Sequence, residues 1–445
     1  MSERKAMAPL LCSQTLLSSH PLRVSCGIAC VTLAFVLTFV LTLHPSEQGQ
    51  SLLFDGHFRP KTPQEYEGRL QIHTGVPEEH NETNFAEPAL KPWDYEYGLS
   101  SAECNASFKE LYREIDRAVA LKKKRTYVTP MDIDISWKET GAVRALIYSQ
   151  KLYIIEAKFS GAGYQRTRAL SILHQIHRAI TTSPSPLPNI EFSFAVSDIA
   201  DPTHSHTIWA LSRLLMDENT WLMPDFGYWS WPLELVGTYE QIRAEMLASE
   251  ADWEDKIPKA LWRGAVKTNP VRGTLMEVTR GKSWADVDAV TWKNRTEVAG
   301  SNAVSMVDHC RYQFLVHTEG RSYSGRGKYL LNCASVVVAH KSEWIEPHQH
   351  LLISSGEHQN FVQVERDFSD LETKVEELLD DPERAVAITR NSVATFRDRY
   401  LTPAAQACYW RHLIRSWAEV SFKPKGWEVS DGGKRRRGTP FETFV

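Results

Sequence analysis

The feature that most constrains the fold is the alternation of short apolar strands with helices in the second half of the chain. Strands are expected at 260–262, 312–316, 335–338, 351–354 and 361–364, and helices at 368–379, 383–399 and 403–420. Strands that alternate with helices are typical of a parallel sheet with helices on both faces. We therefore expect an α/β fold, with a second such half before residue 250 and a cleft between the two halves.

The first half shows the same kind of pattern less regularly. Residues 144–157 are expected to form two short strands about Ser149 and Gln150, and residues 165–180 an amphipathic helix. Apolar residues then alternate from Ile190 to Val196, and Asp198 follows directly. Ligand-handling groups of α/β sheets lie beyond the carboxyl ends of strands, so Asp198 is either catalytic or a helix cap.

Composition excludes two broad classes of protein. The 445 residues carry 51 Lys and Arg against 55 Asp and Glu, a net charge of −4. A general grip on nucleic acid needs a basic excess, so we expect no nucleic-acid partner. A mean hydropathy of −0.36 excludes a polytopic membrane protein.

One apolar segment near the start predicts a membrane anchor. Residues 24–43 contain no charged side chain, and twenty such residues match a bilayer core of about 30 Å. Arg4, Lys5 and Arg23 precede it, which places residues 1–23 in the cytosol and the body of the chain in the lumen. A cleaved signal peptide is the alternative. Residues 44–100, with scattered Pro and Gly, are expected to be a stem.

Two residue types agree with a lumenal body. Asn81, Asn105 and Asn294 each begin an N-glycosylation sequon. Four cysteines follow the anchor, namely Cys104, Cys310, Cys333 and Cys408. In an oxidising compartment four cysteines suggest two disulfides, for which three connectivities are possible.

Several basic residues follow strand ends in the second half and could hold a phosphate. The glycine-rich segment 320–331 follows a strand and opens a helix, and it brings Arg326 and Lys328. Arg263 and Arg272 also follow a strand, and the arginine fork suits a pyrophosphate. A glycine-rich surface turn is the alternative. We expect no metal at Asp132 and Asp134, nor at His348 and His350, which lack a third ligand.

These segments together resemble glycosyltransferase family 90, which includes animal protein O-glucosyltransferases and fungal β-1,2-xylosyltransferases. The resemblance covers roughly residues 165–415, and its most specific part is VDHCRYQFLVHTEGRSYSGRGKYLLNCASVVV at 307–338. It implies a GT-B fold, with two Rossmann-like domains facing a cleft. It also implies disulfides between Cys310 and Cys333 and, for the remaining pair, between Cys104 and Cys408.

The resemblance assigns roles to particular residues. Asp198 stands in the place of the family's catalytic base. The UDP-sugar contacts fall on Thr268, Arg272, Val304, Arg321, Ser322, Tyr323, Ser324, Gly325 and Arg326, supported by Arg263 and Lys328. Ala265 and Gly325 depart from the animal enzymes, which have a polar and an aromatic residue there. Acceptor contacts are expected at Tyr164 and Arg166 and, in the aromatic loop 221–232, at Tyr228, Trp229 and Trp231.

The function expected from this resemblance is that of an inverting, metal-independent glycosyltransferase without a cofactor. It would move xylose or glucose from a UDP-sugar to a hydroxyl of a glycan, a glycolipid or a protein Ser or Thr. The alternative is a non-catalytic lumenal sugar-binding or scaffold protein that keeps the fold. The expected location is the Golgi or endoplasmic reticulum membrane, with a single-pass type II topology.

The expected domains follow from the same reading. Residues 101–250 form the acceptor-side domain and residues 251–400 the nucleotide-sugar domain. Residues 401–422 form a helix that crosses back to the first domain, and residues 423–445 form a basic tail. The run from Lys434 to Arg437 is expected to be a disordered end, with binding to an acidic glycan as the alternative.

Overall fold

The computed structural model of the protein describes residues 92–159, 163–231, 236–294, 297–299, 302–430 and 432–444. The expected anchor at 24–43, most of the stem and the sequon at Asn81 lie outside these residues. Among the residues described, no helix is both long enough and apolar enough to cross a bilayer. Asn105 is exposed on the helix that spans Ser101–Phe108, as a glycosylation site must be.

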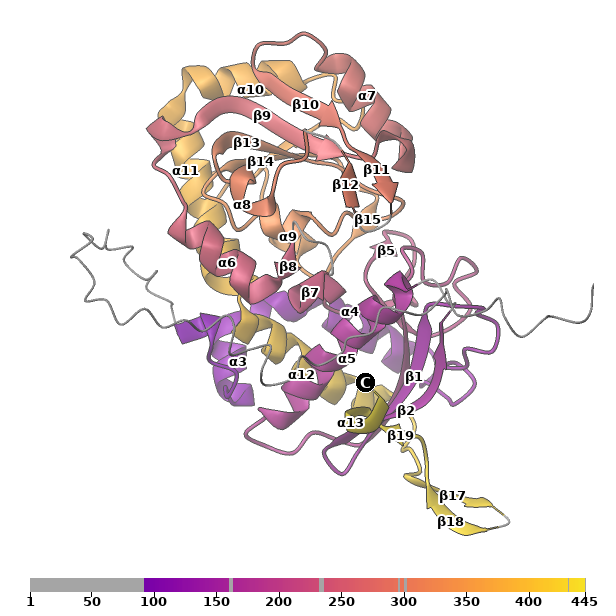
Figure 1. The fold of residues 1–445 in the computed structure, drawn as a ribbon. Coiled ribbons are helices and arrows are strands. Elements are labelled where there is room, and N and C mark those ends of the chain that lie inside the picture. Colours follow the sequence, from indigo (N-terminus) through magenta and orange to yellow (C-terminus); the bar gives the residue numbers. More distant parts are fainter. Residues whose placement is uncertain are drawn as a thin grey trace, which may run out of the picture. The chain divides into compact units, whose positions relative to one another are not determined.

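The first sheet has the strand order β19-β2-β1-β3-β4-β6 (Figure 1). Its strands are β1 (Ala142–Tyr148), β2 (Lys151–Lys158), β3 (Ile190–Ala195), β4 (Trp209–Ala210), β6 (Trp221–Leu222) and β19 (Thr439–Pro440). The two strands expected about Ser149 and Gln150 are confirmed, and both turn residues have a positive φ, as a two-residue hairpin turn requires. So short a turn can only join antiparallel strands, because a parallel pair needs a long crossover.

This hairpin makes the first sheet mixed, so the expectation of a parallel sheet in this half was wrong. Strand β1 pairs antiparallel with both β2 and β3, and only β3, β4 and β6 run parallel. Strand β3 is buried along its whole length, and Asp198 follows it by three residues.

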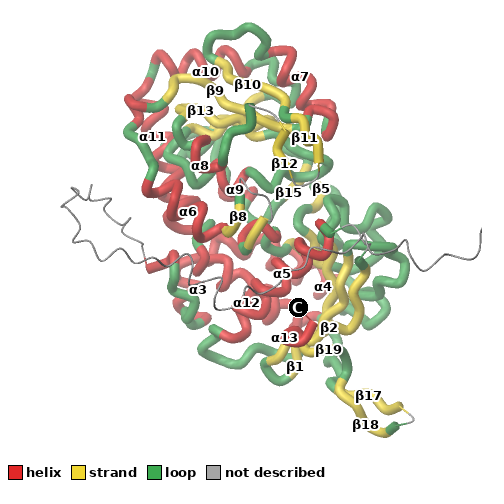
Figure 2. The backbone as a smooth tube through the Cα atoms, viewed as in Figure 1, coloured by secondary structure: helices red, strands yellow, loops and turns green. Residues whose placement is uncertain are grey.

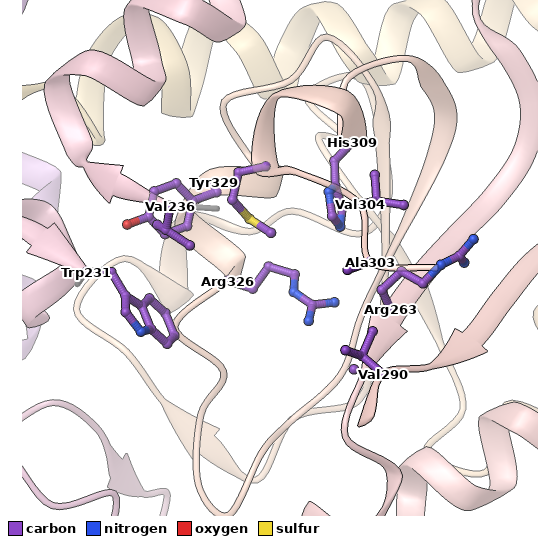
Figure 3. Close-up of a pocket in the computed structure, with 11 residues that line it drawn as sticks. Trp231, Val236, Arg263, Val290, Ala303, Val304, His309, Arg326 and Tyr329 are labelled. Atoms are coloured by element: carbon purple, nitrogen blue, oxygen red, sulfur yellow. The ribbon is translucent and has the colours of Figure 1, made fainter. Parts of the chain in front are cut away.

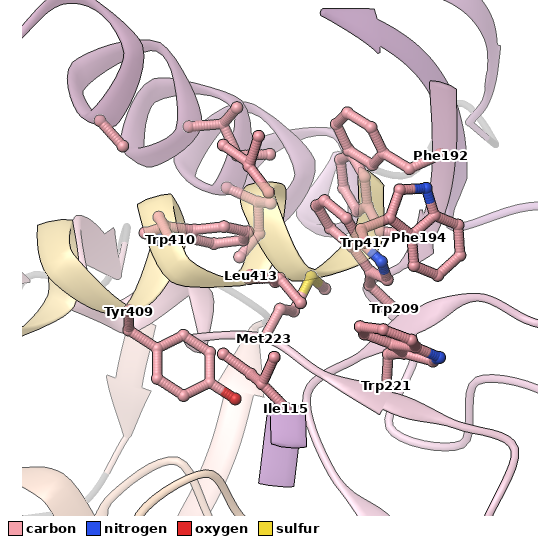
Figure 4. Close-up of a cluster of buried hydrophobic side chains, with 14 of the residues drawn as sticks. Ile115, Phe192, Phe194, Trp209, Trp221, Met223, Tyr409, Trp410, Leu413 and Trp417 are labelled. Atoms are coloured by element: carbon pink, nitrogen blue, oxygen red, sulfur yellow. The ribbon is translucent and has the colours of Figure 1, made fainter. Parts of the chain in front are cut away.

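The longer helices of this half are α3 (Ser101–Phe108), α4 (Arg113–Lys124), α5 (Tyr164–Thr181) and α12 (Pro403–Val420). Helix α12 comes from the end of the chain and contacts α3, α4, α5 and β3. It carries Trp410 and Trp417 into a buried aromatic cluster with Phe192, Trp209 and Trp221 (Figure 4). The ring centroids of Phe192 and Trp209 lie 4.1 Å apart, and much of the tryptophan content of the chain is therefore core packing.

The second sheet is parallel throughout, with the order β10-β9-β13-β14-β16. Its strands are β9 (Ile257–Gly264), β10 (Ala285–Ala289), β13 (Tyr312–His317), β14 (Val336–His340) and β16 (Val362–Val364). The predicted alternation of strands and helices is confirmed here. The strand expected at 351–354 is wrong, because Gln349–Leu351 forms a 3₁₀ turn and the next residues are irregular.

Helices cover both faces of the second sheet, as Figure 2 also shows. They are α6 (Tyr239–Ala248), α7 (Pro270–Val278), α8 (Met306–His309), α9 (Gly327–Leu330), α10 (Leu371–Asp380) and α11 (Pro382–Ser392), and α11 continues as a π-helix to Tyr400. Alternate residues of each strand face opposite sides. Ala260 and Phe314 pack with α7, α10 and α11, whereas Leu261 and Leu315 pack with α6 and α9.

Two disulfides join segments that are distant in the sequence or in the fold. Cys104 bonds Cys408, which fixes α3 to α12, and Cys310 bonds Cys333, which joins the start of β13 to the approach to β14. Both pairs expected from the family resemblance are therefore confirmed.

The end of the chain is ordered in the described residues, so the expectation of a disordered basic end was wrong. Strands β17 (Trp427–Ser430) and β18 (Gly433–Arg436) form a hairpin that stands clear of the neighbouring sheet (Figure 1). Strand β19 and helix α13 (Phe441–Phe444) then return to the edge of the first sheet. Arg437 explains part of this order, because it makes an ion pair with the buried Glu191 at 2.7 Å.

Small two-stranded sheets complete the fold. They are β5 (Arg213–Leu214) with β15 (Trp344–Ile345), β7 (Ser230–Trp231) with β8 (Gly237–Thr238), and β11 (Thr291–Asn294) with β12 (Glu297–Ala299). The first of these pairs joins a loop that follows β4 to a loop that follows β14.

Candidate active site

Asp198 lies just beyond the carboxyl end of β3 and is held by one cation. Nη1 of Arg168, on α5, lies 3.0 Å from Oδ1 of Asp198 and 3.1 Å from the carbonyl oxygen of Val196. The side chain of Asp198 is 39% exposed, so a second molecule can reach the carboxylate. The guanidinium of Arg168 lies 4.5 Å from the ring centroid of Phe226, which fixes its position from the other side.

Sequence reasoning missed Arg168. On the sequence it is one of several basic residues of an amphipathic helix, and nothing in its spacing identifies a partner. The contact depends on α5 lying beside β3, which only the fold shows.

The five acceptor guesses divide between two environments. Tyr164 is half exposed and its ring lies 5.1 Å from the guanidinium of Arg168, so it borders Asp198, while Arg166 is exposed on the same helix. In the aromatic loop, Tyr228 is buried against Tyr239 and Trp229 stacks on His174. The remaining residue, Trp231, lines a cavity and is described below with it.

The glycine-rich turn makes its strongest contacts with the first half of the chain. The hydroxyl of Tyr323 donates a hydrogen bond to Oδ2 of Asp225, and Nζ of Lys328 lies 2.6 Å from Oδ1 of the same carboxylate. Lys328 was predicted to support a phosphate, but in the structure its charge is paired with Asp225. Helix α9, which follows the turn, is only a single turn long.

The other residues of the turn are placed differently from one another. Arg321 is exposed and Ser324 is half-buried. Ser322 is buried, and its Oγ has no hydrogen-bond partner in the part of the chain that the structure describes. Gly325 lies against Trp231, and a Cβ at Gly325 would stand 2.9 Å from Cζ3 of that ring. A larger side chain at this position therefore requires Trp231 to move.

Two arginines beside the turn have no acidic partner in the described part of the chain. Arg272 is buried, and its Nε lies 3.1 Å from Oγ1 of Thr318 and 2.9 Å from the carbonyl oxygen of Glu319. Arg326 is half-buried, and its guanidinium group makes neither a hydrogen bond nor an ion pair with any residue described. Burial lowers the pKa of Arg272 to about 10, and burial together with the charge of Arg272 lowers the pKa of Arg326 to about 9.

Neighbouring cations without an anion form a site that an anionic ligand would complete. Both guanidinium groups keep their charge at neutral pH, because the lowered pKa values still lie well above 7. Removing a charge from water is costly unless an opposite charge compensates it. A diphosphate offers that compensation, and arginine binds phosphate oxygens through two parallel hydrogen bonds.

Arg326 also lines a cavity beside the turn (Figure 3). Most of its wall is apolar and includes Trp231 and Val304. Its remaining charged residue, Arg263, is already paired, because its Nη2 lies 2.6 Å from Oδ1 of Asp286. Arg326 is therefore the one unpaired cation among the described residues of the wall.

The predicted donor residues border two neighbouring hollows. Val304 and Arg326 line the cavity, whereas Thr268, Gly320 and Arg321 line a more open hollow on the other side of the turn. Arg272 joins the segment after β9 to the segment after β13, since its Nη1 lies 3.1 Å from the carbonyl oxygen of Ala265 and its Nε lies 2.9 Å from that of Glu319.

Three other side chains considered as metal ligands in the sequence, Asp132, Asp134 and His350, have hydrogen-bond partners within the chain. Oδ2 of Asp132 accepts from the backbone and hydroxyl of Thr129, and Oδ2 of Asp134 accepts from Ser136, so each carboxylate caps its own turn. Nε2 of His350 lies 2.6 Å from the carbonyl oxygen of Glu110. No group of three or more metal-ligating side chains occurs among the residues described.

The fold and the site together define an α/β protein that presents unpaired arginines at the carboxyl ends of parallel strands. The family model for glycosyl transferase family 90 matches residues 100–428. The chain therefore belongs to that family, and the match begins earlier than the segments that carry the resemblance in the sequence.

Known relatives are distant in sequence. Protein O-glucosyltransferase 1 of Rattus norvegicus is 27% identical over 215 residues, which are 44% of this chain and 53% of the relative. An O-glucosyltransferase rumi homolog of Anopheles gambiae is 28% identical over 42% of this chain and 47% of its own length. Protein O-glucosyltransferase 3 of Homo sapiens is 23% identical over 58% of this chain and 46% of its own length. The chain thus matches about half the length of these relatives.

Proposed function

We propose that the protein is an inverting glycosyltransferase that moves a sugar from a UDP-sugar to an acceptor hydroxyl. The observation that carries the proposal is the pair of arginines without acidic partners, Arg272 and Arg326, in the half of the chain opposite the accessible carboxylate of Asp198. The names of the relatives favour glucose as the sugar and a protein as the acceptor. Xylose is the alternative sugar.

Asp198 is the proposed general base. Its carboxylate removes the proton of the acceptor hydroxyl as that oxygen forms a bond to the anomeric carbon of the donor, and the bond from that carbon to the diphosphate oxygen breaks on the opposite face. The configuration at the anomeric carbon is therefore inverted. Arg168 orients the carboxylate through the 3.0 Å contact while leaving its other oxygen open to the acceptor.

The leaving diphosphate gains negative charge as the bond breaks. Arg272 and Arg326 stabilise this charge, and they act strongly because burial shields both guanidinium groups from water. Arg272 is fixed by hydrogen bonds to Thr318 and to two backbone carbonyl groups. With two guanidinium groups in this place, we propose that the reaction needs no divalent metal.

The finer topology is also part of the proposal. The mixed sheet and the parallel sheet would be the acceptor and donor halves of a GT-B fold, with the transfer taking place between them. Residues 24–43 would anchor the enzyme as a type II protein of the Golgi or endoplasmic reticulum, with its body in the lumen.

A donor screen in the presence of EDTA tests the proposal. The purified protein is incubated with UDP-glucose, UDP-xylose, UDP-galactose, UDP-GlcNAc and UDP-glucuronate, and free UDP is measured. We expect release from one donor, and a loss of about 10²–10⁴-fold in Asp198→Asn. Asp116→Asn is the matched control, because Asp116 is an exposed carboxylate on α4 that contacts His412.

The alternative outcomes separate the candidate functions. Binding of UDP without turnover, even with a folded protein acceptor present, would favour a sugar-binding protein over an enzyme. Turnover that appears only after Mn²⁺ replaces EDTA would contradict metal independence. A protein that binds no UDP at all would contradict the nucleotide-sugar proposal.

A further inference from the structure

His309 forms part of the wall of the cavity that contains Arg326 (Figure 3). It is the last residue of α8 and only 1% exposed. Nδ1 of its ring lies 2.7 Å from the carbonyl oxygen of Ser305. A carbonyl oxygen only accepts hydrogen bonds, so Nδ1 carries the proton.

The ring is neutral, and its second nitrogen is an acceptor. Burial, together with the nearby charge of Arg326, lowers the pKa of His309 to about 3. At neutral pH the ring therefore carries one proton, and that proton is on Nδ1. Nε2 presents a lone pair and can only accept a hydrogen bond.

Nε2 of His309 is buried and has no partner among the described residues. Two other polar groups of the wall donate elsewhere, since Arg263 donates to Asp286 and the hydroxyl of Tyr329 donates to the carbonyl oxygen of Gly227. The guanidinium of Arg326 is in the same wall, but it does not donate to Nε2 of His309 either. A buried acceptor left without a donor costs about 1–3 kcal/mol. Such a group in a cavity wall indicates a ligand that supplies the donor.

We infer that Nε2 of His309 accepts a hydrogen bond from the imide N–H of the donor nucleotide's base and so selects uracil. The inference rests on the proposed function, because it identifies the part of the donor that enters this cavity. Val290 and Val304 give the cavity apolar walls that suit the faces of a planar ring. Arg326 in the same wall lies within reach of the attached phosphates.

The protonation state of the His309 ring determines which base the site prefers. The N3 position of uracil carries a hydrogen and pairs with the lone pair of Nε2. The N3 position of cytosine carries a lone pair instead, so two acceptors would face each other. A site built to pair with an N–H group discriminates strongly against analogues that lack it, because its own buried group is then left unpaired.

Nucleotide analogues test this inference on the unmodified protein. Competition by UDP, CDP, 3-methyl-UDP and 2′-deoxy-UDP is measured against a fluorescent UDP probe. We expect CDP and 3-methyl-UDP to bind at least about tenfold more weakly than UDP, as the loss of one buried hydrogen bond implies. We expect 2′-deoxy-UDP to bind like UDP. A loss with 2′-deoxy-UDP alone would instead identify a ribose hydroxyl as the donor and overturn the assignment to the base.

A ring-conserving variant then assigns the effect to His309. His309→Phe keeps a planar ring but removes the acceptor, so UDP should bind about tenfold more weakly while CDP binding stays the same. The ratio of the two affinities should therefore approach one. His412→Phe is the matched control, because His412 stacks on Tyr112 at the surface of α12, far along the chain from this cavity.

The outcomes distinguish this inference from the proposed function. Equal affinity for UDP and CDP in the unmodified protein overturns the inference and leaves the transferase proposal standing. The absence of any UDP binding overturns the proposed function itself. If His309→Phe does not fold, as judged by its melting temperature, the analogue series on the unmodified protein decides alone.

Discussion

Replacing Arg326 by methionine should stabilise the free protein and abolish its stabilisation by UDP. Arg326 is half-buried, lies near the charge of Arg272 and has no partner among the described residues. The burial of this unpaired charge therefore lowers the free energy of unfolding of the ligand-free protein. Methionine keeps most of the length of the side chain and removes the charge. We expect the free energy of unfolding to rise by about 1–3 kcal/mol, the range for relieving an unpaired buried polar group.

The same substitution should reduce the stabilisation that UDP gives to the folded protein. At a UDP concentration of one hundred times its Kd, a ligand that binds only the folded state adds about 2.7 kcal/mol of stability. In the wild type UDP should therefore raise the melting temperature by several degrees. In Arg326→Met the increase should largely disappear, because the diphosphate has lost one of its two cations.

Differential scanning fluorimetry measures the melting temperature of the free protein and the increase in melting temperature that UDP causes. Arg263→Met is the control in the same cavity. Arg263 is paired with Asp286 at 2.6 Å, so its removal leaves a carboxylate without its cation and should lower the melting temperature of the free protein. The reasoning is refuted if Arg326→Met is less stable than the wild type without ligand, or if UDP stabilises it as much as it stabilises the wild type.

Three further predictions concern the groups around the site. Arg168→Met should lower kcat about tenfold or more without changing UDP affinity, because only the orientation of Asp198 is lost; steady-state kinetics and calorimetry separate the two. Tyr323→Phe should raise the donor KM and cost about 1.5–3 kcal/mol in urea unfolding, because a hydrogen bond to the carboxylate of Asp225 is lost; an unchanged KM would argue against a positioning role for this bond. Glu346 is a buried carboxyl group near Lys328 and Asp225, and burial raises its pKa to about 8. The folded state therefore loses stability as the pH rises from about 4.5 to 8 and the buried group becomes charged. Glu346→Gln should therefore remove this loss, which melting temperatures from pH 5 to 8.5 would show.

The sequence predicted those parts of the fold that depend on local pattern. The strand and helix alternation in the second half predicted the parallel sheet, because its central strands β13 and β14 are buried on both faces and read as short apolar runs. The edge strand β10 is only partly buried and was not predicted. The turn at Ser149 and Gln150 predicted two strands. So short a turn also requires the two strands to be antiparallel, which makes the first sheet mixed.

Contacts between distant segments could not be predicted in this way. Arg168 is separated from Asp198 by 30 residues, and Asp225 is separated from Tyr323 by 98. No sequence pattern indicates either contact, because each depends on how a helix or loop packs against another element of the fold. The hairpin of β17 and β18 was missed for a related reason. Its run of basic residues is typical of a solvent-exposed, disordered segment. In the structure, Arg437 is instead held by a hydrogen bond to the side chain of Glu191, 246 residues earlier in the chain.

Asp225 and the residue after it link the glycine-rich turn to the environment of Asp198. One buried carboxylate accepts from Tyr323 and Lys328 of the turn, and its Oδ1 also lies 2.6 Å from the backbone nitrogen of Gly227. The next residue, Phe226, lies under the guanidinium that holds Asp198. The side chains of Asp225 and Lys328 are only 4% and 2% exposed, so losing either one strands a buried charge, at a cost of about 3–5 kcal/mol. If the proposed mechanism holds, a substitution in this loop that shifts Asp225 should therefore change donor binding as well as proton removal.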